Sequence, residues 1–128
     1  MDTGKKLHTL TGHSKRVRSV AISPDGQTLI SASDDKTIKL WSLNTGRQSG
    51  TFIGHSTWIN SVAISPNGQT LVSGEHKTIK IWQLNTAREI CSLNGHSDWV
   101  NSVAFSPDSK IFASGSADNT IKIWQYRE

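Results

Sequence analysis

Histidine, serine and aspartate, the residue types of nucleophilic catalytic triads, recur at matched spacings in this chain of 128 residues. The same order occurs twice, as His13, Ser31 and Asp35 and again as His96, Ser114 and Asp118. A hydrolase would place one such set beside a nucleophile elbow and an oxyanion loop, and neither motif accompanies them. Two copies of the trio therefore favour a repeated structural role over an active site.

The other residues that could do chemistry do not gather into a site. The chain has no Gly-rich phosphate loop and no paired carboxylates. A single cysteine, Cys91, leaves Cys-rich zinc sites without ligands. His8 and His76 lack further ligands at metal-like spacing, so we expect both on the surface or in turns. We predict no enzymatic activity, no metal and no cofactor.

Composition predicts a soluble protein. Hydrophobic residues make up 34% of the chain and charged residues 19%, and the mean hydropathy is −0.41. No apolar run approaches the ~18 to 20 residues of a membrane helix, and residues 1–6 lack the core of a signal peptide. One cysteine excludes an internal disulfide framework and fits a reducing compartment, so we expect a cytoplasmic protein with no membrane partner.

The net charge of +4 is spread along the chain. The densest basic group is Lys15, Arg16 and Arg18. A solvated loop is the preferred interpretation of this group, and a patch for phosphates or an acidic partner is the alternative. A nucleic-acid partner is therefore not favoured.

Tryptophan is unusually frequent, with five residues against one tyrosine and three phenylalanines, which points to a repeated unit. Three markers share one period of 41 to 42 residues: the Gly-His pairs ending at His13, His55 and His96, the Ser-Pro pairs starting at Ser23, Ser65 and Ser106, and the tryptophans Trp41, Trp82 and Trp124. Three markers in one phase establish an internal repeat.

Each unit has the sequence pattern of short strands separated by turns. In the first unit, β-rich runs cover residues 17–22, 27–33, 37–41 and 48–52, and Ser-Pro-Asp-Gly forms the first turn. No segment has a sustained 3.6-residue period. We predict an all-β protein in which each unit is a four-stranded antiparallel meander.

The succession of Gly-His, Ser-Pro-Asp-Gly and Ser-Ala-Ser-Asp-Asp-Lys-Thr-Ile-Lys-Leu-Trp resembles the WD repeat, the blade unit of many β-propellers. The resemblance extends from about Lys6 to Tyr126, with Trp-Ser or Trp-Gln in place of Trp-Asp. It implies repeats at residues 12–53, 54–94 and 95–128. The last repeat lacks its own outer strand, and residues 1–11 would supply an outer strand to a blade of a neighbouring chain.

The resemblance also implies a hydrogen-bonded polar set in each blade: a His before the first strand, a Ser in the second, an Asp in the following turn and the Trp of the third. By position these sets are His13, Ser31, Asp35 and Trp41; His55, Ser73 and Trp82; and His96, Ser114, Asp118 and Trp124. In the second unit, residues 71–78 are one residue shorter than residues 29–37, and Glu75 or His76 is nearest to the lost Asp. This change is either a remodelled turn on the binding face or drift in a tolerant repeat. We predict that the second blade is the least stable.

Three blades are too few for a closed propeller, which typically has 4 to 8. A single chain should therefore expose apolar faces at positions such as Val20 and Ile22. Residues 6–10 resemble the outer strands and would join one chain head-to-tail to residues 121–126 of another. Two copies would give six blades, which we favour slightly, and three copies would give nine. The alternative is that the chain is a fragment of a longer WD-repeat protein.

In this fold, the loop before the first strand lies on the face usually used for partners. Candidate binding residues at repeated positions there are Arg16, Trp58 and Trp99, followed two residues later by Arg18, Asn60 and Asn101. Large aromatic and arginine side chains suit an interface hot spot, although the tryptophans could equally pack on the adjacent blade. The predicted function is a non-catalytic scaffold that assembles into a ring and binds a protein or peptide.

Overall fold

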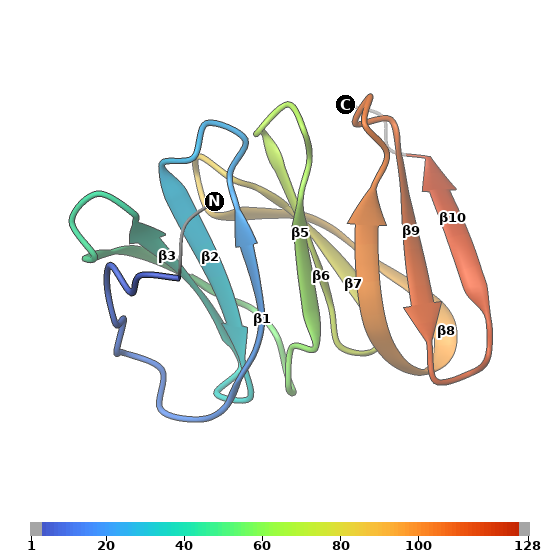
Figure 1. The fold of residues 1–128 in the computed structure, drawn as a ribbon. Helices are drawn as coiled ribbons and strands as arrows, with labels where there is room; N and C mark the ends of the chain where they lie inside the picture. The colour runs from blue at the N-terminus through green and yellow to red at the C-terminus, as the bar shows by residue number, and fades with distance from the viewer. Residues whose placement is uncertain (1–3, 126–128) are drawn as a thin grey trace.

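The computed structural model describes residues 4–125, which form strands, turns and connecting segments (Figure 1). The strands are β1 (Val17–Ile22), β2 (Thr28–Ser33), β3 (Thr37–Ser42), β4 (Gln48–Ile53), β5 (Ser61–Ile64), β6 (Thr70–Gly74), β7 (His76–Gln83), β8 (Arg88–Phe105), β9 (Ile111–Ser116) and β10 (Ile121–Gln125). There is no helix within these residues. The prediction of an all-β fold is confirmed.

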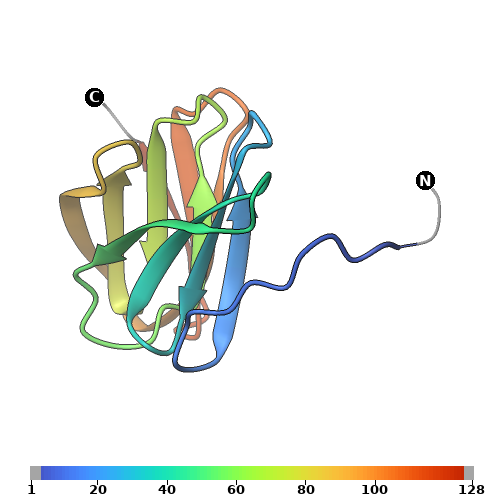
Figure 2. The same cartoon turned by 90° about the vertical axis from the view of Figure 1, so that its left-hand side faces the viewer.

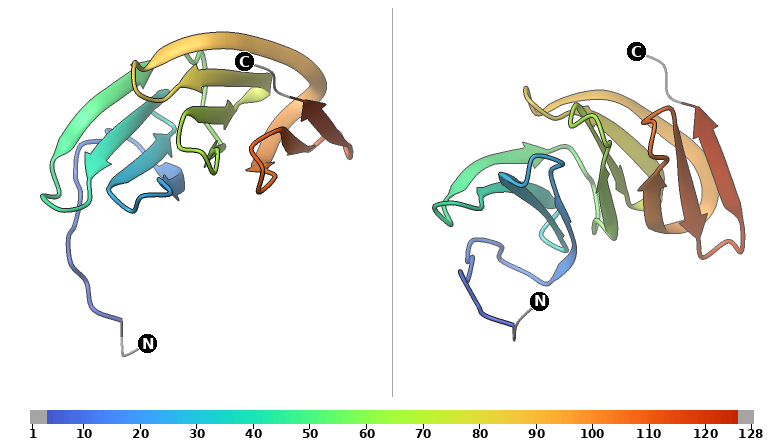
Figure 3. Two further views of the ribbon diagram at one scale, coloured as in Figure 1. Left: turned by 90° about the horizontal axis from the view of Figure 1, so that it is seen from above. Right: turned by 45° about the horizontal axis from the view of Figure 1, so that its top comes forward.

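The strands form three antiparallel blades arranged in an arc, with β1, β5 and the end of β8 along its concave side (Figure 3). Blade 1 is the sheet β1-β2-β3-β4. The second sheet has the order β10-β9-β8-β7-β6-β5, because the first part of β8 pairs with β7 and the last part pairs with β9. Blade 2 is therefore β5, β6, β7 and the start of β8, and blade 3 is the end of β8 with β9 and β10.

Strand β8 differs from the sequence expectation, which placed a break at Gly95-His96 between two strands. The ladder continues because β7 begins at His76, which pairs with Trp99. The turn between β6 and β7 is one residue shorter in the second unit. Strand β7 therefore begins directly after Glu75, and its first residue, His76, lies opposite Trp99. Between blades 1 and 2, by contrast, residues 54–60 leave the strands.

The N-terminal segment, residues 4–12, is extended (Figure 2), and its residues Leu7, His8 and Leu10 line a cavity together with Leu29 and Leu43 of blade 1. Within residues 4–125 it is not part of any strand. Its assignment as an outer strand for a neighbouring chain concerns an assembly and stays a prediction. Residues 1–3 of that strand, and residues 126–128 of the third repeat including Tyr126, lie outside the described residues.

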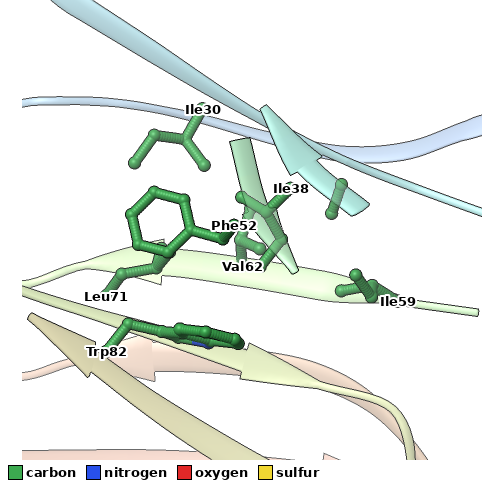
Figure 4. Packing of buried hydrophobic residues seen from close by; sticks show 8 residues of the cluster. Ile30, Ile38, Phe52, Ile59, Val62, Leu71 and Trp82 are labelled. Carbon is green, nitrogen blue, oxygen red and sulfur yellow. The ribbon is translucent and has the colours of Figure 1, made fainter. Parts of the chain in front are cut away.

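The hydrophobic core lies between the blades. At the first contact, blade 1 side chains pack against those of blade 2 (Figure 4): Ile30, Ile38 and Phe52 meet Val62, Leu71 and Trp82. Phe52 and Trp82 meet edge to face with their ring centroids 5.4 Å apart. The second contact has the same plan, with Val72, Ile79 and Ile81 against Val100, Val103 and Phe112. Each blade is therefore stabilised mainly by its neighbours, as in other repeat proteins.

Candidate functional site

The histidine, serine and tryptophan of each unit form one hydrogen-bonded chain, centred on the serine hydroxyl. The Nε1 atoms of Trp41, Trp82 and Trp124 donate to Ser31, Ser73 and Ser114 at 2.8, 2.9 and 2.9 Å. The same Oγ atoms lie 2.6, 2.6 and 2.7 Å from the Nε2 atoms of His13, His55 and His96. Because an indole N–H only donates, the serine oxygen accepts from tryptophan and its own proton is available to the imidazole.

In blades 1 and 3 an aspartate completes the chain. The Nδ1 atoms of His13 and His96 lie 2.8 Å from Asp35 and Asp118. Each carboxylate also accepts from the amide that follows the histidine, at 3.1 Å for Ser14. A threonine two residues after each carboxylate donates to it through both its amide and its hydroxyl group. The carboxylate therefore ties the loop before the first strand to the turn after the second.

These hydrogen bonds hold both aspartates in their charged form. Burial would raise the pKa of Asp35, but the bonds from Thr37, His13 and Ser14 outweigh it and hold that pKa well below its ordinary value of 3.8. For Asp118, the bond from Thr120 is the largest cause, and it lowers the pKa well below the same value.

In blade 2 the buried Glu75 occupies the place of the missing aspartate. Its Oε2 lies 3.2 Å from His55 Nδ1, yet the geometry is not that of a hydrogen bond, and this buried nitrogen has no hydrogen-bond partner. The amides of Ser56 and Thr57 donate to Glu75 at 3.3 Å each. Burial would raise the pKa of Glu75, but His55 and the two amides lower it. The sequence left Glu75 and His76 as alternatives; the structure places Glu75 here.

The glycine of each Gly-His pair has a role that the residue pattern did not disclose. A Cβ atom added at Gly12, Gly54 or Gly95 would lie 2.9, 2.8 or 2.5 Å from Cη2 of the tryptophan of the same unit. The indole ring therefore packs directly over the glycine backbone, which leaves no room for a side chain. The signal in the sequence was the fixed pairing of Gly with His at the tryptophan period.

Acid should destabilise the fold through Asp35 and Asp118. Because their pKa values are lower in the folded state, their contribution to the unfolding free energy is complete above the ordinary pKa of 3.8 and is lost as the pH falls below it. Urea unfolding measured from pH 7 down to pH 2 should show this decline. The Asp35→Asn variant should have a shallower dependence in the acid range, and an unchanged slope would contradict this explanation.

Four side chains from the three blades form a row, which we call the tryptophan row: Arg18, Trp58, Trp99 and His76. Trp58 and Trp99 are stacked with their ring centroids 5.6 Å apart. The Arg18 guanidinium lies 4.6 Å from the centroid of Trp58, and the His76 ring lies 4.7 Å from Trp99. Trp58 is 44% exposed. The tryptophans thus contact a neighbouring blade and still present a surface to solvent.

The other candidate binding residues lie around this row. Asn60 Nδ2 donates to the carbonyl oxygen of Val100 at 3.4 Å, across the contact between blades 2 and 3. Arg16, the blade 1 equivalent of Trp58, and Asn101, the blade 3 equivalent of Asn60, are both exposed. Arg18 is ion-paired with Asp34, so the basic group seen in the sequence is partly neutralised. In the part of the chain that the structure describes, no group of three acidic, His or Cys residues could hold a metal, and no helix is long and apolar enough to cross a membrane.

Comparison with known proteins identifies the family. The family described as WD domain, G-beta repeat, matches residues 4–42, 46–83 and 87–125. The chain therefore belongs to the WD40 repeat family, and its blades are those of a WD-repeat β-propeller.

Among curated relatives, similarity covers about one repeat. Protein FIZZY-RELATED 1 of Arabidopsis thaliana is 51% identical over 41 residues, which are 32% of this chain and 9% of that protein. Lissencephaly-1 homolog 1 of Paramecium tetraurelia is 50% identical over 40 residues, covering 31% of this chain and 10% of that protein. Small ribosomal subunit protein RACK1 of Caenorhabditis elegans is 51% identical over 41 residues, covering 32% and 13%.

Solved structures match nearly all of the chain. The crystal structure of RRP9 WD40 repeats superposes with a TM-score of 0.88 and 31% identity, covering 91% of this chain and 37% of that one. The structure of U3-55K gives the same TM-score and identity and is covered to 38%. The chain thus spans less than two fifths of these propeller structures, and a much smaller share of the curated relatives.

Proposed function

We propose that this protein is a non-catalytic scaffold that binds a protein or peptide at the tryptophan row. The observation that carries the proposal is the stacked, partly exposed pair of Trp58 and Trp99 with Arg18 over one end. Aromatic and arginine side chains at the centre of an interface contribute most of the binding energy, and their rigid stacking lowers the entropic cost of association.

The buried state of the three serines supports a structural role for the histidine sets. Ser31, Ser73 and Ser114 are at most 4% exposed, and each hydroxyl oxygen already accepts an indole hydrogen bond. A nucleophile must meet its substrate, and these hydroxyl groups are enclosed by the blade. The sets of blades 2 and 3 fix His55 and His96, each three residues before a tryptophan of the row.

The five tryptophans allow a direct test of this function. Peptides selected from a random library for binding to the wild type should shift the indole N–H NMR signals of Trp58 and Trp99 and leave those of Trp41, Trp82 and Trp124 unchanged. The Trp58→Ala/Trp99→Ala variant should bind these peptides at least about 30-fold more weakly, as expected for a hot spot of 2 kcal/mol or more.

The control for this test is Ile90→Ala, which truncates an exposed side chain outside the row and should bind as the wild type does. Undiminished peptide binding by the double variant would refute the tryptophan row as the binding site.

The proposal includes assembly of copies of the chain into a closed ring. Three blades form an arc and leave apolar side chains exposed at both ends, and further blades would cover them. The fragment interpretation predicts instead that the remaining blades come from the same polypeptide, and the mass of the 128-residue chain in solution separates the two.

A further inference from the structure

The two ends of the arc carry exposed apolar strand residues. On blade 1, Val17, Val20 and Ile22 are 48, 59 and 59% exposed. On blade 3, Ile121 and Ile123 are 76 and 66% exposed. β-branched side chains facing water on a sheet are typical of a surface that has a partner.

The same repeat positions are buried or partly buried wherever two blades meet inside the chain. The equivalents of Val17 and Val20 are Ile59 and Val62 in blade 2, which are 0 and 5% exposed, and Val100 and Val103 in blade 3, which are 0 and 7% exposed. The equivalents of Ile121 are Ile38 and Ile79, both fully buried, and Ile81, the equivalent of Ile123, is 3% exposed. The two ends are thus the two halves of a contact that the chain already makes twice.

The groups that form hydrogen bonds between blades inside the chain also have equivalents at the two ends of the arc. The Val62 amide donates to Ser19 Oγ at 3.2 Å, and the Val103 amide donates to Ser61 Oγ at 3.2 Å. The next serine in this series is Ser102, which is exposed on the end of blade 3, and the next amide is that of Val20 on the end of blade 1. The Ile59 and Val100 amides likewise donate to the carbonyl oxygens of Ser33 and Glu75. At the two ends of the arc, the corresponding amide is that of Val17 and the corresponding carbonyl group is that of Ser116.

The edge of blade 3 has a matching segment at the start of the chain. In blades 1 and 2, Phe52 and Leu93 of the outer strands pair with Ile38 and Ile79 of the strands next to them. Each lies three residues before a histidine, and Leu10 has the same place before His13. The partner position for Leu10 is therefore Ile121 on β10, which is the edge strand of blade 3 in the described residues.

We propose that the end of blade 3 binds the end of blade 1 of a second copy, with Val20 and Ile22 packed on Ile121 and Ile123 and the N-terminal segment added to β10. This inference rests on the ring assembly of the proposed function and specifies its contact. The two ends are different surfaces, so the contact is heterologous, and the proposed ring requires that the rotation per copy closes, since a contact that does not close forms a filament.

Complementary variants test the contact. The wild type should have a mass in light scattering that is a multiple of the 14.0 kDa of one chain, about 28 kDa for two copies. Val20→Asp and Ile123→Asp each block one end, and each alone should be a folded monomer, since both side chains are exposed in the single chain. We expect the dissociation constant to rise by roughly 100-fold or more, because an unpaired charge enters an apolar contact.

A mixture of the two variants keeps one intact pair of ends and should give a one-to-one heterodimer. Ile53→Asp is the matched control: Ile53 is 78% exposed, and its repeat equivalent Asn94 stays exposed in blade 2, which has a blade on either side, so this variant should assemble as the wild type does. A monomeric wild type would overturn the ring assembly itself. An assembled wild type whose mixed variants give no heterodimer would overturn only the contact. Peptide binding at the tryptophan row can be measured on the monomeric variants, so it tests the binding site independently of the assembly.

Discussion

The Ser73→Ala variant should lose about 2 to 6 kcal/mol of unfolding free energy, because each of two buried groups left without a partner costs about 1 to 3 kcal/mol. Ser73 Oγ accepts from Trp82 Nε1 at 2.9 Å and lies 2.6 Å from His55 Nε2. All three residues are buried. His55 Nδ1 already lacks a hydrogen-bond partner, so without Ser73 the imidazole would keep none.

The effect should extend beyond blade 2, because Trp82 is part of the core between blades 1 and 2. Urea unfolding followed by circular dichroism measures the loss. The control is Ser92→Ala, an exposed serine bonded to Lys80 and Glu89, whose removal should change stability by no more than about 0.5 kcal/mol. A Ser73→Ala variant as stable as this control would show that the central hydroxyl does not hold the polar set together.

The repeat spacing predicted the blades and their strand order, because each marker reports a feature inside one unit. A turn, a strand or a hydrogen bond between His96 and Ser114 depends on a local register that is the same in every copy. The sequence therefore also indicated which histidines, serines and tryptophans the structure brings together.

What the spacing could not predict depends on how one unit meets the next. Arg18 stacks on Trp58, and Trp58 stacks on Trp99, across two contacts between blades. The sequence favoured neither packing on the adjacent blade nor exposure for these tryptophans. In the structure they pack across a contact between blades and are also partly exposed. The continuous strand β8 and the position of Glu75 beside His55 both follow from the one residue that the turn of the second unit lacks. The sequence shows that this residue is missing, but not which neighbouring groups then come close enough to interact.

Repairing the turn of blade 2 should stabilise the protein. The change replaces Glu75-His76 with Ser-Asp-Asp, the residues found at the corresponding turn of blade 1 as Ser33, Asp34 and Asp35. The new aspartate should approach His55 as Asp35 approaches His13, at 2.8 Å instead of the present 3.2 Å. Satisfying a buried polar atom is worth about 1 to 3 kcal/mol, which corresponds to a rise in Tm of roughly 3 to 10 °C for a chain of this size.

Two costs oppose the gain, namely the loss of the buried Glu75 side chain and of the contact between His76 and Trp99. Neither should cancel it, because Glu75 forms only long hydrogen bonds to two amides, and His76 is exposed. The matched control carries Ser-Asp-Ala in place of Ser-Asp-Asp: it has the longer turn without an acceptor for His55 Nδ1, so a rise in Tm specific to the aspartate isolates its bond to His55. If neither graft raises Tm in calorimetry, the unpaired imidazole nitrogen is not what weakens blade 2, and the shorter turn is then a tolerated variation of the repeat.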